Sequence, residues 1–540
     1  MSVDTPEAQT PPIRRGVPTR LNPATLLNNP AFFYILRRLI TGFFVLLGAT
    51  FLMYMLVVWS GDPRQNFESY PPDIRASKIR AVTEALHLND NVISRYFNWL
   101  GGAGKCFVPG MDCNLGKTID NTEVTAVLGN AITTTLRLVL LSLALAVVLG
   151  VIVGILSALR QYSVLDYSVT FTSFLFYSLP IFWVAVLLKE FGAIKFNNWL
   201  ADPTIPIWVS VVLGLLFGLV LAAVLGGSPR RRWIVLGAAL VVTVAVLQYF
   251  SAVEWFHRPA LGPGLILVLA IAIAVIATIL VAGLKARPVL SSAVLAAVAG
   301  TLCGVVLQPV LKNPSVGFLV LLGIIAIVVS GLLGWFIGGE DYRSQAVRAA
   351  IFTGVGTGLV ILWDRVLSNF ARFSDKKFGR PIPTVGDSTP NFQGNIWQHF
   401  LDISTSLLLP TIALILISFA SYTRYTRASM LEVMNQDYIR TARAKGLTER
   451  TVVMRHAFRN ALIPLTTVVA YDFAAVIGGA VITENVFGWK GMGTLFIQGL
   501  NAVNPNVVMA FFLVTGVAAV LFNLIADLLY TALDPRIRLQ

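Results

Sequence analysis

The chain has 540 residues, of which 56% are hydrophobic and only 13% are charged. Ordinary globular domains carry about 25% charged residues, so this composition excludes a soluble multidomain protein and predicts an all-α polytopic membrane protein. The net charge of +14 does not indicate nucleic-acid binding, because the basic residues lie beside apolar segments, as cytoplasmic loops of membrane proteins require.

The first 60 residues predict a cytoplasmic tail and one membrane helix. Residues 1–30 are polar and proline-rich, so we expect them to be disordered on the cytoplasmic side. The apolar run Leu39–Trp59 follows two arginines and is long enough to span a bilayer. No small-residue cleavage site follows this run, which indicates an uncleaved first helix with its amino terminus inside.

A polar segment, residues 61–130, follows the first apolar run and is expected on the extracytoplasmic side. It contains Cys106 and Cys113, seven positions apart. Because disulfides persist outside the cytoplasm, a disulfide between them is favoured over two free thiols. A metal site is not expected here, since the only histidine of the segment is His87.

The second and third membrane spans are predicted at about residues 131–158 and 168–193. Pro180 interrupts the third span within the sequence SLPIFW, residues 178–183. Proline has no backbone N–H and leaves a carbonyl without its helical donor, so we expect a kink. Two interpretations remain open: a purely structural kink, or a helix that bends as a transport pathway opens.

Residues 196–395 hold six further apolar runs, near 206–226, 233–252, 262–284, 289–311, 315–338 and 347–366. Alternate turns between these runs carry seven basic residues: Arg230, Arg231, Arg232, Lys285, Arg287, Arg343 and Arg348. The intervening turns offer only Arg258 and Lys312, so the first set is predicted to be cytoplasmic. The runs lack a central cluster of ionisable residues, which argues against a separate ion pathway and favours a peripheral scaffold or partner-binding domain.

Three more spans are predicted in residues 396–540, ending at about residue 425 and covering about 461–483 and 507–530, for about twelve in total. Asp472 lies midway along the second of these three. A carboxylate at that depth costs about 2.5–3.5 kcal/mol on insertion scales, so it should face the protein interior or a wet cavity. A hydrogen-bonded packing acid is favoured over a polar wall of the translocation path.

A basic loop, residues 429–460, separates two of these spans and predicts a helix, a glycine turn and a second helix. Gly446 fits the turn because glycine enters the left-handed conformation without steric cost. Thr448 can cap the second helix, which is predicted to end at the Ile463-Pro464 step. The first helix has an apolar face, since apolar or small side chains recur every four residues: Met430, Met434, Tyr438 and Ala442.

The sequence DYIRTARAKG, residues 437–446, resembles the cytoplasmic coupling motif of ABC-importer permeases, in the form found in bacterial dipeptide and oligopeptide importers. The general motif begins Glu-Ala-Ala, whereas Arg440 and Thr441 occupy the first two places here, as in the peptide subfamily. Further strings resemble the family in the same order: GDP at 61–63, SLPIFW at 178–183, LLPT at 408–411, GAVITENVF at 479–487 with GMG at 491–493, and DPRIR at 534–538.

The resemblance covers about residues 31–195 and 396–540, and implies a six-helix permease core interrupted by the insert 196–395. It implies a subunit of an ATP-driven importer for di- or oligopeptides, without an ATPase site or cofactor of its own. The residues implied to couple transport to the ATPase are Tyr438, Arg440, Thr441, Ala442, Arg443, Lys445 and Gly446.

The partners implied by the resemblance are a second related permease, two ABC ATPase subunits or domains that bind ATP–Mg, and an extracytoplasmic solute-binding protein or lipoprotein. The implied location is the bacterial cytoplasmic membrane, with both termini in the cytoplasm. A nickel permease of the same family is the nearest alternative. An ion-coupled secondary transporter is suggested only by the number of spans, and a membrane scaffold would explain the insert but not residues 437–446.

Overall fold

The computed structural model describes residues 30–533, and it describes side chains for residues 32–473 and 480–529. The expected disordered tail and the DPRIR string at 534–538 therefore lie outside the described residues. Within the described part the chain is helical, and its only extended pairing is an isolated bridge between Lys117 and Glu123. The protein is a multi-pass helical membrane protein.

Ten of the described helices are long and apolar enough to cross a membrane, and one bent pair raises the number to eleven. The expected total of about twelve is not confirmed. The predicted fifth span of the core corresponds to α19 (Phe458–Phe487). That helix is not among the ten.

The first part of the chain contains more helix than expected. The predicted second span begins at Val124 rather than at about residue 131, and two amphipathic helices occupy the polar segment before it. The elements are α2 (Pro30–Trp59), η1 (Pro63–Phe67), α3 (Pro72–Ala85), α4 (Val92–Lys105) and α5 (Val124–Leu159).

The predicted third span is broken rather than kinked. The helices on the two sides of Leu179-Pro180 are bent by 101°. Leu179 has an extended backbone (φ −82°, ψ 128°), because the ring of a following proline disfavours the helical conformation. The elements are α6 (Val164–Ser178), α7 (Ile181–Leu187), the π-helical η2 (Leu188–Lys195) and α8 (Phe196–Leu200).

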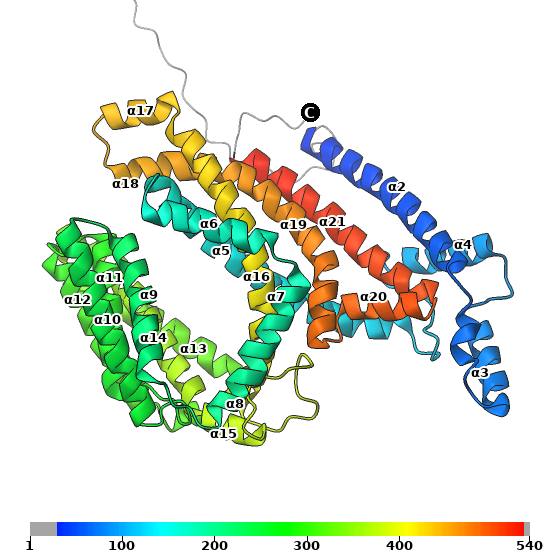
Figure 1. The fold of residues 1–540 in the computed structure, drawn as a ribbon. Coiled ribbons are helices and arrows are strands. Elements are labelled where there is room, and N and C mark those ends of the chain that lie inside the picture. Colours follow the sequence, from blue (N-terminus) through cyan, green and yellow to red (C-terminus); the bar gives the residue numbers. More distant parts are fainter. Residues whose placement is uncertain (1–29, 534–540) are drawn as a thin grey trace, which may run out of the picture.

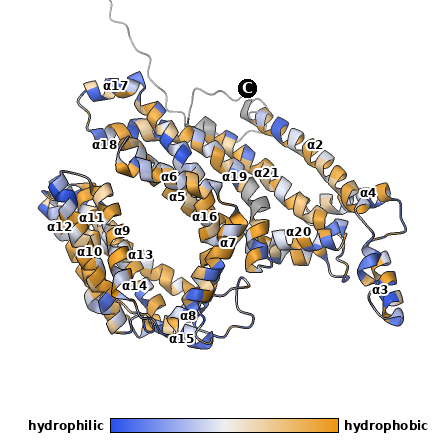
Figure 2. Cartoon of the chain, in the orientation of Figure 1, coloured by the Kyte–Doolittle hydropathy of each residue, from blue (hydrophilic) through white to orange (hydrophobic). Residues whose placement is uncertain are grey.

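Each of the six apolar runs of the insert forms one helix, and the six helices lie together as a bundle beside the rest of the molecule (Figure 1). Their middles are apolar, as the hydropathy colours show (Figure 2). Small residues permit close packing: a Cβ on Gly334 would lie 2.6 Å from the backbone oxygen of Ala346. The helices are α9 (Ile207–Leu225), α10 (Pro229–Ala252), α11 (Gly262–Val281), α12 (Arg287–Val306), α13 (Val316–Ile337) and α14 (Gly339–Ser368), with η3 (Val310–Lys312) between α12 and α13.

The chain returns from the insert through α15 and a coil that packs on the other helices. Ile382 in that coil is buried, and Lys377 pairs with Asp402 at 2.7 Å. The remaining elements are α15 (Phe370–Lys376), α16 (Ile396–Met434), α17 (Asp437–Ala444), α18 (Glu449–Thr451), the π-helical η4 (Val452–Ala457), α19 (Phe458–Phe487), α20 (Met492–Asn501) and α21 (Pro505–Leu533).

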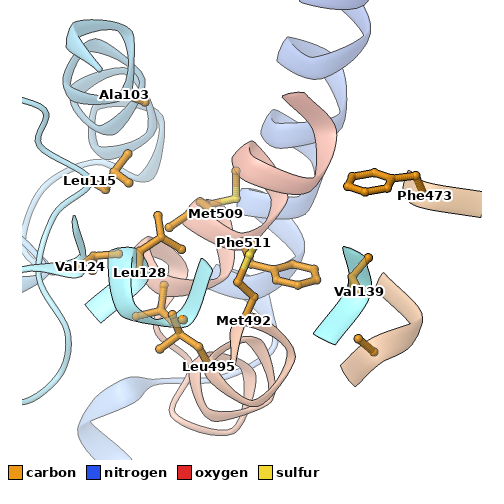
Figure 3. Packing of buried hydrophobic residues seen from close by; sticks show 14 of the residues in the cluster. Ala103, Leu115, Val124, Leu128, Val139, Phe473, Met492, Leu495, Met509 and Phe511 are labelled. Atoms are coloured by element: carbon orange, nitrogen blue, oxygen red, sulfur yellow. The ribbon is translucent and has the colours of Figure 1, made fainter. Parts of the chain in front are cut away.

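The largest apolar cluster joins the first and last parts of the chain. Figure 3 shows side chains from α4 and α5 packed against others from α19, α20 and α21. Two phenylalanine pairs stack within it, Phe473 on Phe522 and Phe496 on Phe511. Helices from the first and last parts of the chain therefore form one core, to which the insert bundle is added at the side.

Candidate coupling loop and membrane path

The loop between α16 and α19 projects beyond the ends of the long helices, and α17 is its outermost element (Figure 1). Much of α17 has the colour of hydrophilic residues (Figure 2). Two of its residues, Ile439 and Ala442, are buried. The helix therefore has one apolar side, turned toward the protein, and a polar side available to a partner.

The expected single helix from Met430 to Ala442 is wrong. The chain leaves the helix at Asn435-Gln436, where Gln436 is extended (φ −73°, ψ 150°), and α17 then starts in a new direction. Ile439 rather than Tyr438 provides the buried contact, because the break resets the helical register. Tyr438 is 41% exposed.

An apolar cluster, hereafter the loop base, connects this loop to the membrane helices. Its buried members come from α5, α16, α17, η4 and α19, so that the loop touches three long helices at once. Such contacts transmit a displacement, because close-packed apolar groups resist compression. The members are Ala158, Met430, Ile439, Ala442, Val452, Val453, Ala457 and Ala461.

Gly446 ends α17 with φ +73°, in the left-handed conformation expected from the sequence. An ion pair closes the turn around it: the Arg443 guanidinium donates to both carboxylate oxygens of Glu449, at 2.8 and 3.2 Å. This hydrogen bonding holds the pKa of Glu449 below its usual range. Thr448 caps the next helix by accepting a hydrogen bond from the Thr451 backbone N–H.

The other basic side chains of the predicted coupling residues point to solvent. Arg440 and Lys445 are exposed, as is Thr441, and Arg440 lies 3.6 Å from Asp437 on the same helix. Their role at an ATPase interface stays a prediction. Arg443 differs from them, since its guanidinium already binds within the loop.

The second helix of the loop does not end at Pro464, contrary to expectation. It continues through η4 into α19 as far as Phe487, with Pro464 inside. Membrane helices tolerate proline because neighbouring groups and local adjustments satisfy the freed backbone carbonyl.

A buried ion pair that the sequence did not suggest ties α6 to α16 below the loop. Arg427 donates to both oxygens of Asp166, at 2.7 and 2.9 Å. Ser157, at the end of α5, donates to the same carboxylate at 2.5 Å. The Asp166 side chain is 3% exposed. Three helices thus meet at one charge, close to the loop base.

Asp472 lies on α19 and is half-buried, near Tyr422 on α16, whose buried hydroxyl has no hydrogen-bond partner. Tyr422 is fully buried. Among the described residues no hydrogen bond joins Asp472 to this hydroxyl, so the hydrogen-bonded packing role and the path role of Asp472 both stay predictions. Pro180, the other predicted path residue, is exposed at the break between α6 and α7, and its role also stays a prediction.

A second buried carboxylate, Glu484, organises the end of α19. It accepts hydrogen bonds from the backbone of Gly493 at 2.8 Å and from the Thr135 hydroxyl at 2.5 Å. A Cβ on Gly491 would lie 2.4 Å from the Glu484 carboxyl carbon. The strings GAVITENVF and GMG are therefore parts of one contact between α19, α20 and α5, which the sequence alone did not connect.

The cysteine pair lies at the end of α4, where a 2.02 Å S–S bond joins Cys106 and Cys113. This is on the part of the chain expected outside the cytoplasm. The bond closes the segment between α4 and the bridge at Lys117.

Two arginines of the core touch the insert. The Arg450 guanidinium, in the loop, donates to the Leu280 carbonyl at 2.8 Å. Arg160, after α5, donates to the Ala223 carbonyl. Both carbonyls belong to the last turns of insert helices, whose final carbonyls lack helical donors. The ends of α9 and α11 therefore lie on the same side of the molecule as the coupling loop.

Comparison with known proteins relates parts of the sequence to transport proteins. Residues 296–539 match the family model described as "Binding-protein-dependent transport system inner membrane component". This range begins within the insert and includes the coupling loop, α19 and α20.

Among individual proteins, the oligopeptide transport system permease protein OppB of Mycobacterium tuberculosis is 42% identical over 156 residues, 29% of this chain and 48% of that protein. The oligopeptide permease AppB of Bacillus subtilis is 44% identical over 156 residues, again 29% of this chain and 48% of that protein. The dipeptide permease DppB of Escherichia coli is 44% identical over 140 residues, 26% and 41% respectively. The chain spans about half the length of these relatives.

Proposed function

Taking residues 296–539 as a binding-protein-dependent inner-membrane transport component, we propose that the chain is a permease subunit of an ATP-driven importer and that its cargo is a di- or oligopeptide. The relatives named above are described as oligopeptide and dipeptide permeases, which supports this cargo. The same names do not favour the nickel alternative.

The observation that carries the proposal is the position of α17 on the loop base. An ATPase that pushed the polar side of α17 would press Ile439 and Ala442 against the ends of α5, α16 and α19. The spans would then move together between inward-facing and outward-facing arrangements. Arg440, Thr441 and Lys445 offer the hydrogen-bond donors for the ATPase surface.

The assembly that this mechanism requires contains a second related permease, two ATPase subunits or domains and an extracytoplasmic solute-binding protein. ATP–Mg is bound by the ATPases, and this chain supplies no catalytic group. The coupling loop faces the cytoplasm of a bacterium, as do both termini, and the disulfide between Cys106 and Cys113 faces outward.

Asp472 and Pro180 are the two residues that we propose for the cargo path, and substitution of Asp472 tests this. A carboxylate beside the path would attract the amino group of a peptide, whereas a packing acid would only hold α19 to α16. Asp472→Asn separates the two roles, because it keeps the shape and removes the charge. Altered preference between peptides of different charge supports a path role, and unchanged preference with lower thermal stability supports packing.

The decisive experiment is reconstitution of the complete importer in proteoliposomes, with ATP enclosed and the solute-binding protein outside. We expect ATP-dependent accumulation of labelled trialanine and no accumulation of labelled nickel. A matched assembly with a hydrolysis-deficient ATPase is the control. Nickel uptake without peptide uptake would contradict the cargo assignment, and uptake driven by an ion gradient without ATP would contradict the class.

A further inference from the structure

A polar hollow of about 730 Å³ lies among α3, α4, the end of α2 and the start of α21, away from the coupling loop. None of the residues discussed above as coupling or path residues lines it. Its volume falls in the range of about 300–1,000 Å³ usual for small-ligand sites. The residues used below are Tyr54, Arg95, Trp99, Asn114, Lys117 and Asn506.

Arg95 is the unusual member of this group. It is only 8% exposed, and its Nε has no hydrogen-bond partner. Its charged neighbours do not pair with it: among the described residues, no carboxylate lies within 4.0 Å of its guanidinium. Tyr54, which is 2% exposed, places its hydroxyl beside the guanidinium.

A second buried donor lines the same hollow. Trp99 is 5% exposed and its indole Nε1 has no partner. Burying an ionised group or a polar N–H without an acceptor costs free energy, which a bound acceptor removes. Two residues that line one hollow thus each carry a buried donor without a partner, and a ligand that brings acceptor oxygens to this wall would relieve that cost.

The charges around the hollow indicate the charge that a ligand should carry. Lys117 and Lys105 line it together with Glu84 and Glu123, so that Arg95 leaves a net positive balance. Asp62 lines a small adjoining hollow together with Arg95, but its carboxylate accepts from the Arg64 backbone N–H at 2.9 Å and lies 4.0 Å from the Arg64 guanidinium. The planar guanidinium matches the two oxygens of a carboxylate.

We propose that Arg95 and Trp99 form a carboxylate-binding subsite in this outer hollow, and that it receives the carboxyl terminus of the peptide cargo. The hollow is large enough for a short peptide, and the amides of Asn114 and Asn506 line it beside the two donors. The identity of the cargo rests on the proposed function, whereas the carboxylate chemistry rests on the hollow itself.

The test measures binding to the full chain in lipid nanodiscs by equilibrium dialysis with labelled trialanine. We expect binding of trialanine, and binding of trialanine amide weaker by about tenfold or more, because the amide lacks the charged acceptor. Arg95→Gln should weaken trialanine binding by a similar factor, and Arg64→Gln, a matched change in the adjoining hollow, should not. Acetate as competitor distinguishes a free carboxylate from a peptide terminus.

Each outcome decides a point. Equal binding of acid and amide by the unaltered chain, or absence of trialanine binding, overturns the subsite even where Arg95→Gln fails to fold. Acetate competing as strongly as trialanine supports a carboxylate site but overturns the peptide assignment. If Arg95→Gln leaves peptide uptake by the whole importer unchanged, the proposed function stands and this inference is overturned. Trialanine binding through Arg95 without any uptake retains the subsite and overturns the proposed function.

Discussion

The core and the insert contact the coupling loop in different ways. Core helices and the loop pack together in the loop base, whose eight buried side chains come from both. The Arg427–Asp166 ion pair lies close to this cluster. The insert reaches the loop through the Arg450–Leu280 hydrogen bond, between exposed groups. A movement of the loop is therefore transmitted directly to core helices and only weakly to the insert.

The two regions also differ in their buried charges. Within the described residues the core buries Asp166, Asp402 and Glu484, whereas the insert buries one acid, Asp364. Asp364 accepts hydrogen bonds from the backbone of Leu261 and Gly262, at the start of α11. Asp166 and Glu484 each join core helices that are distant in sequence, and in the insert Asp364 plays a similar part between α14 and the start of α11, beside close packing at small residues. We infer that the core helices change their arrangement during transport and that the insert is a peripheral scaffold.

The largest difference is expected from one substitution made in each region. Gly446→Val in the loop and Gly339→Val in the insert both force a left-handed backbone (φ +73° and +60°) on a branched residue, and a Cβ meets open space at both. Each costs about 1–2 kcal/mol or more. We expect Gly446→Val to abolish ATP-driven uptake while ATP hydrolysis continues, and Gly339→Val to leave uptake largely intact. If both substitutions reduced uptake equally in the proteoliposome assay, the loop and the insert could not be assigned different roles in transport.

The second comparison sets the Arg427–Asp166 pair of the core, which joins α16 to α6, against the Asp364–Arg365 pair of the insert, which lies within one helix. Arg427→Gln leaves Asp166 without its cation, and we expect a loss of about 3 kcal/mol, the lower end for a broken buried pair since Arg427 is partly exposed. Asp364→Asn keeps an acceptor oxygen for the backbone of Leu261 and removes the negative charge beside Arg365, so a smaller loss of about 1.5 kcal/mol is expected. Thermal unfolding measures both. The double change Arg427→Gln with Asp166→Asn should recover part of the loss, and no recovery would mean that the two groups act separately.

The third comparison concerns the point where the regions meet. We expect Arg450→Gln to change coupled uptake up to about fivefold, the effect of a charged hydrogen bond worth about 1 kcal/mol. The matched test excises residues 207–368 with a short linker, because segments on either side of the cut, Asn197–Ala201 and Phe370–Arg380, line one hollow. Arg450→Gln should have no further effect in that shortened chain. A persisting effect would assign Arg450 to the ATPase rather than to the insert.

The sequence predicted those parts of the molecule that local physics determines. The six insert helices follow from the length and apolarity that a bilayer imposes, and the turn at Gly446 follows from glycine's access to positive φ. The break at Asn435-Gln436 was missed because it separates helices whose apolar spacing looks continuous. The Asp166–Arg427 pair, 261 positions apart, and the Glu484 contacts were missed because tertiary packing alone brings these groups together.

The smallest expected effect lies within the loop itself, at the Arg443–Glu449 pair that spans Gly446. Both side chains are largely exposed (42% and 58%), so the pair contributes about 0.2–1 kcal/mol and is screened by salt. Because Arg443 lowers the pKa of Glu449, this contribution is present above the usual glutamate pKa and is lost as the pH falls through the lowered value. Hydrogen exchange at residues 445–449 measures it.

We expect Glu449→Gln to raise exchange slightly at neutral pH and low salt, and the unaltered loop to approach the variant at high salt or acidic pH. Asp437→Asn, which removes the looser 3.6 Å contact with Arg440, is the matched control and should change exchange less. A large effect of Glu449→Gln that salt does not reduce would show that the turn, rather than the loop base, holds the loop to the core. The turn at Gly446, rather than the loop base, would then be the contact that distinguishes the core from the insert.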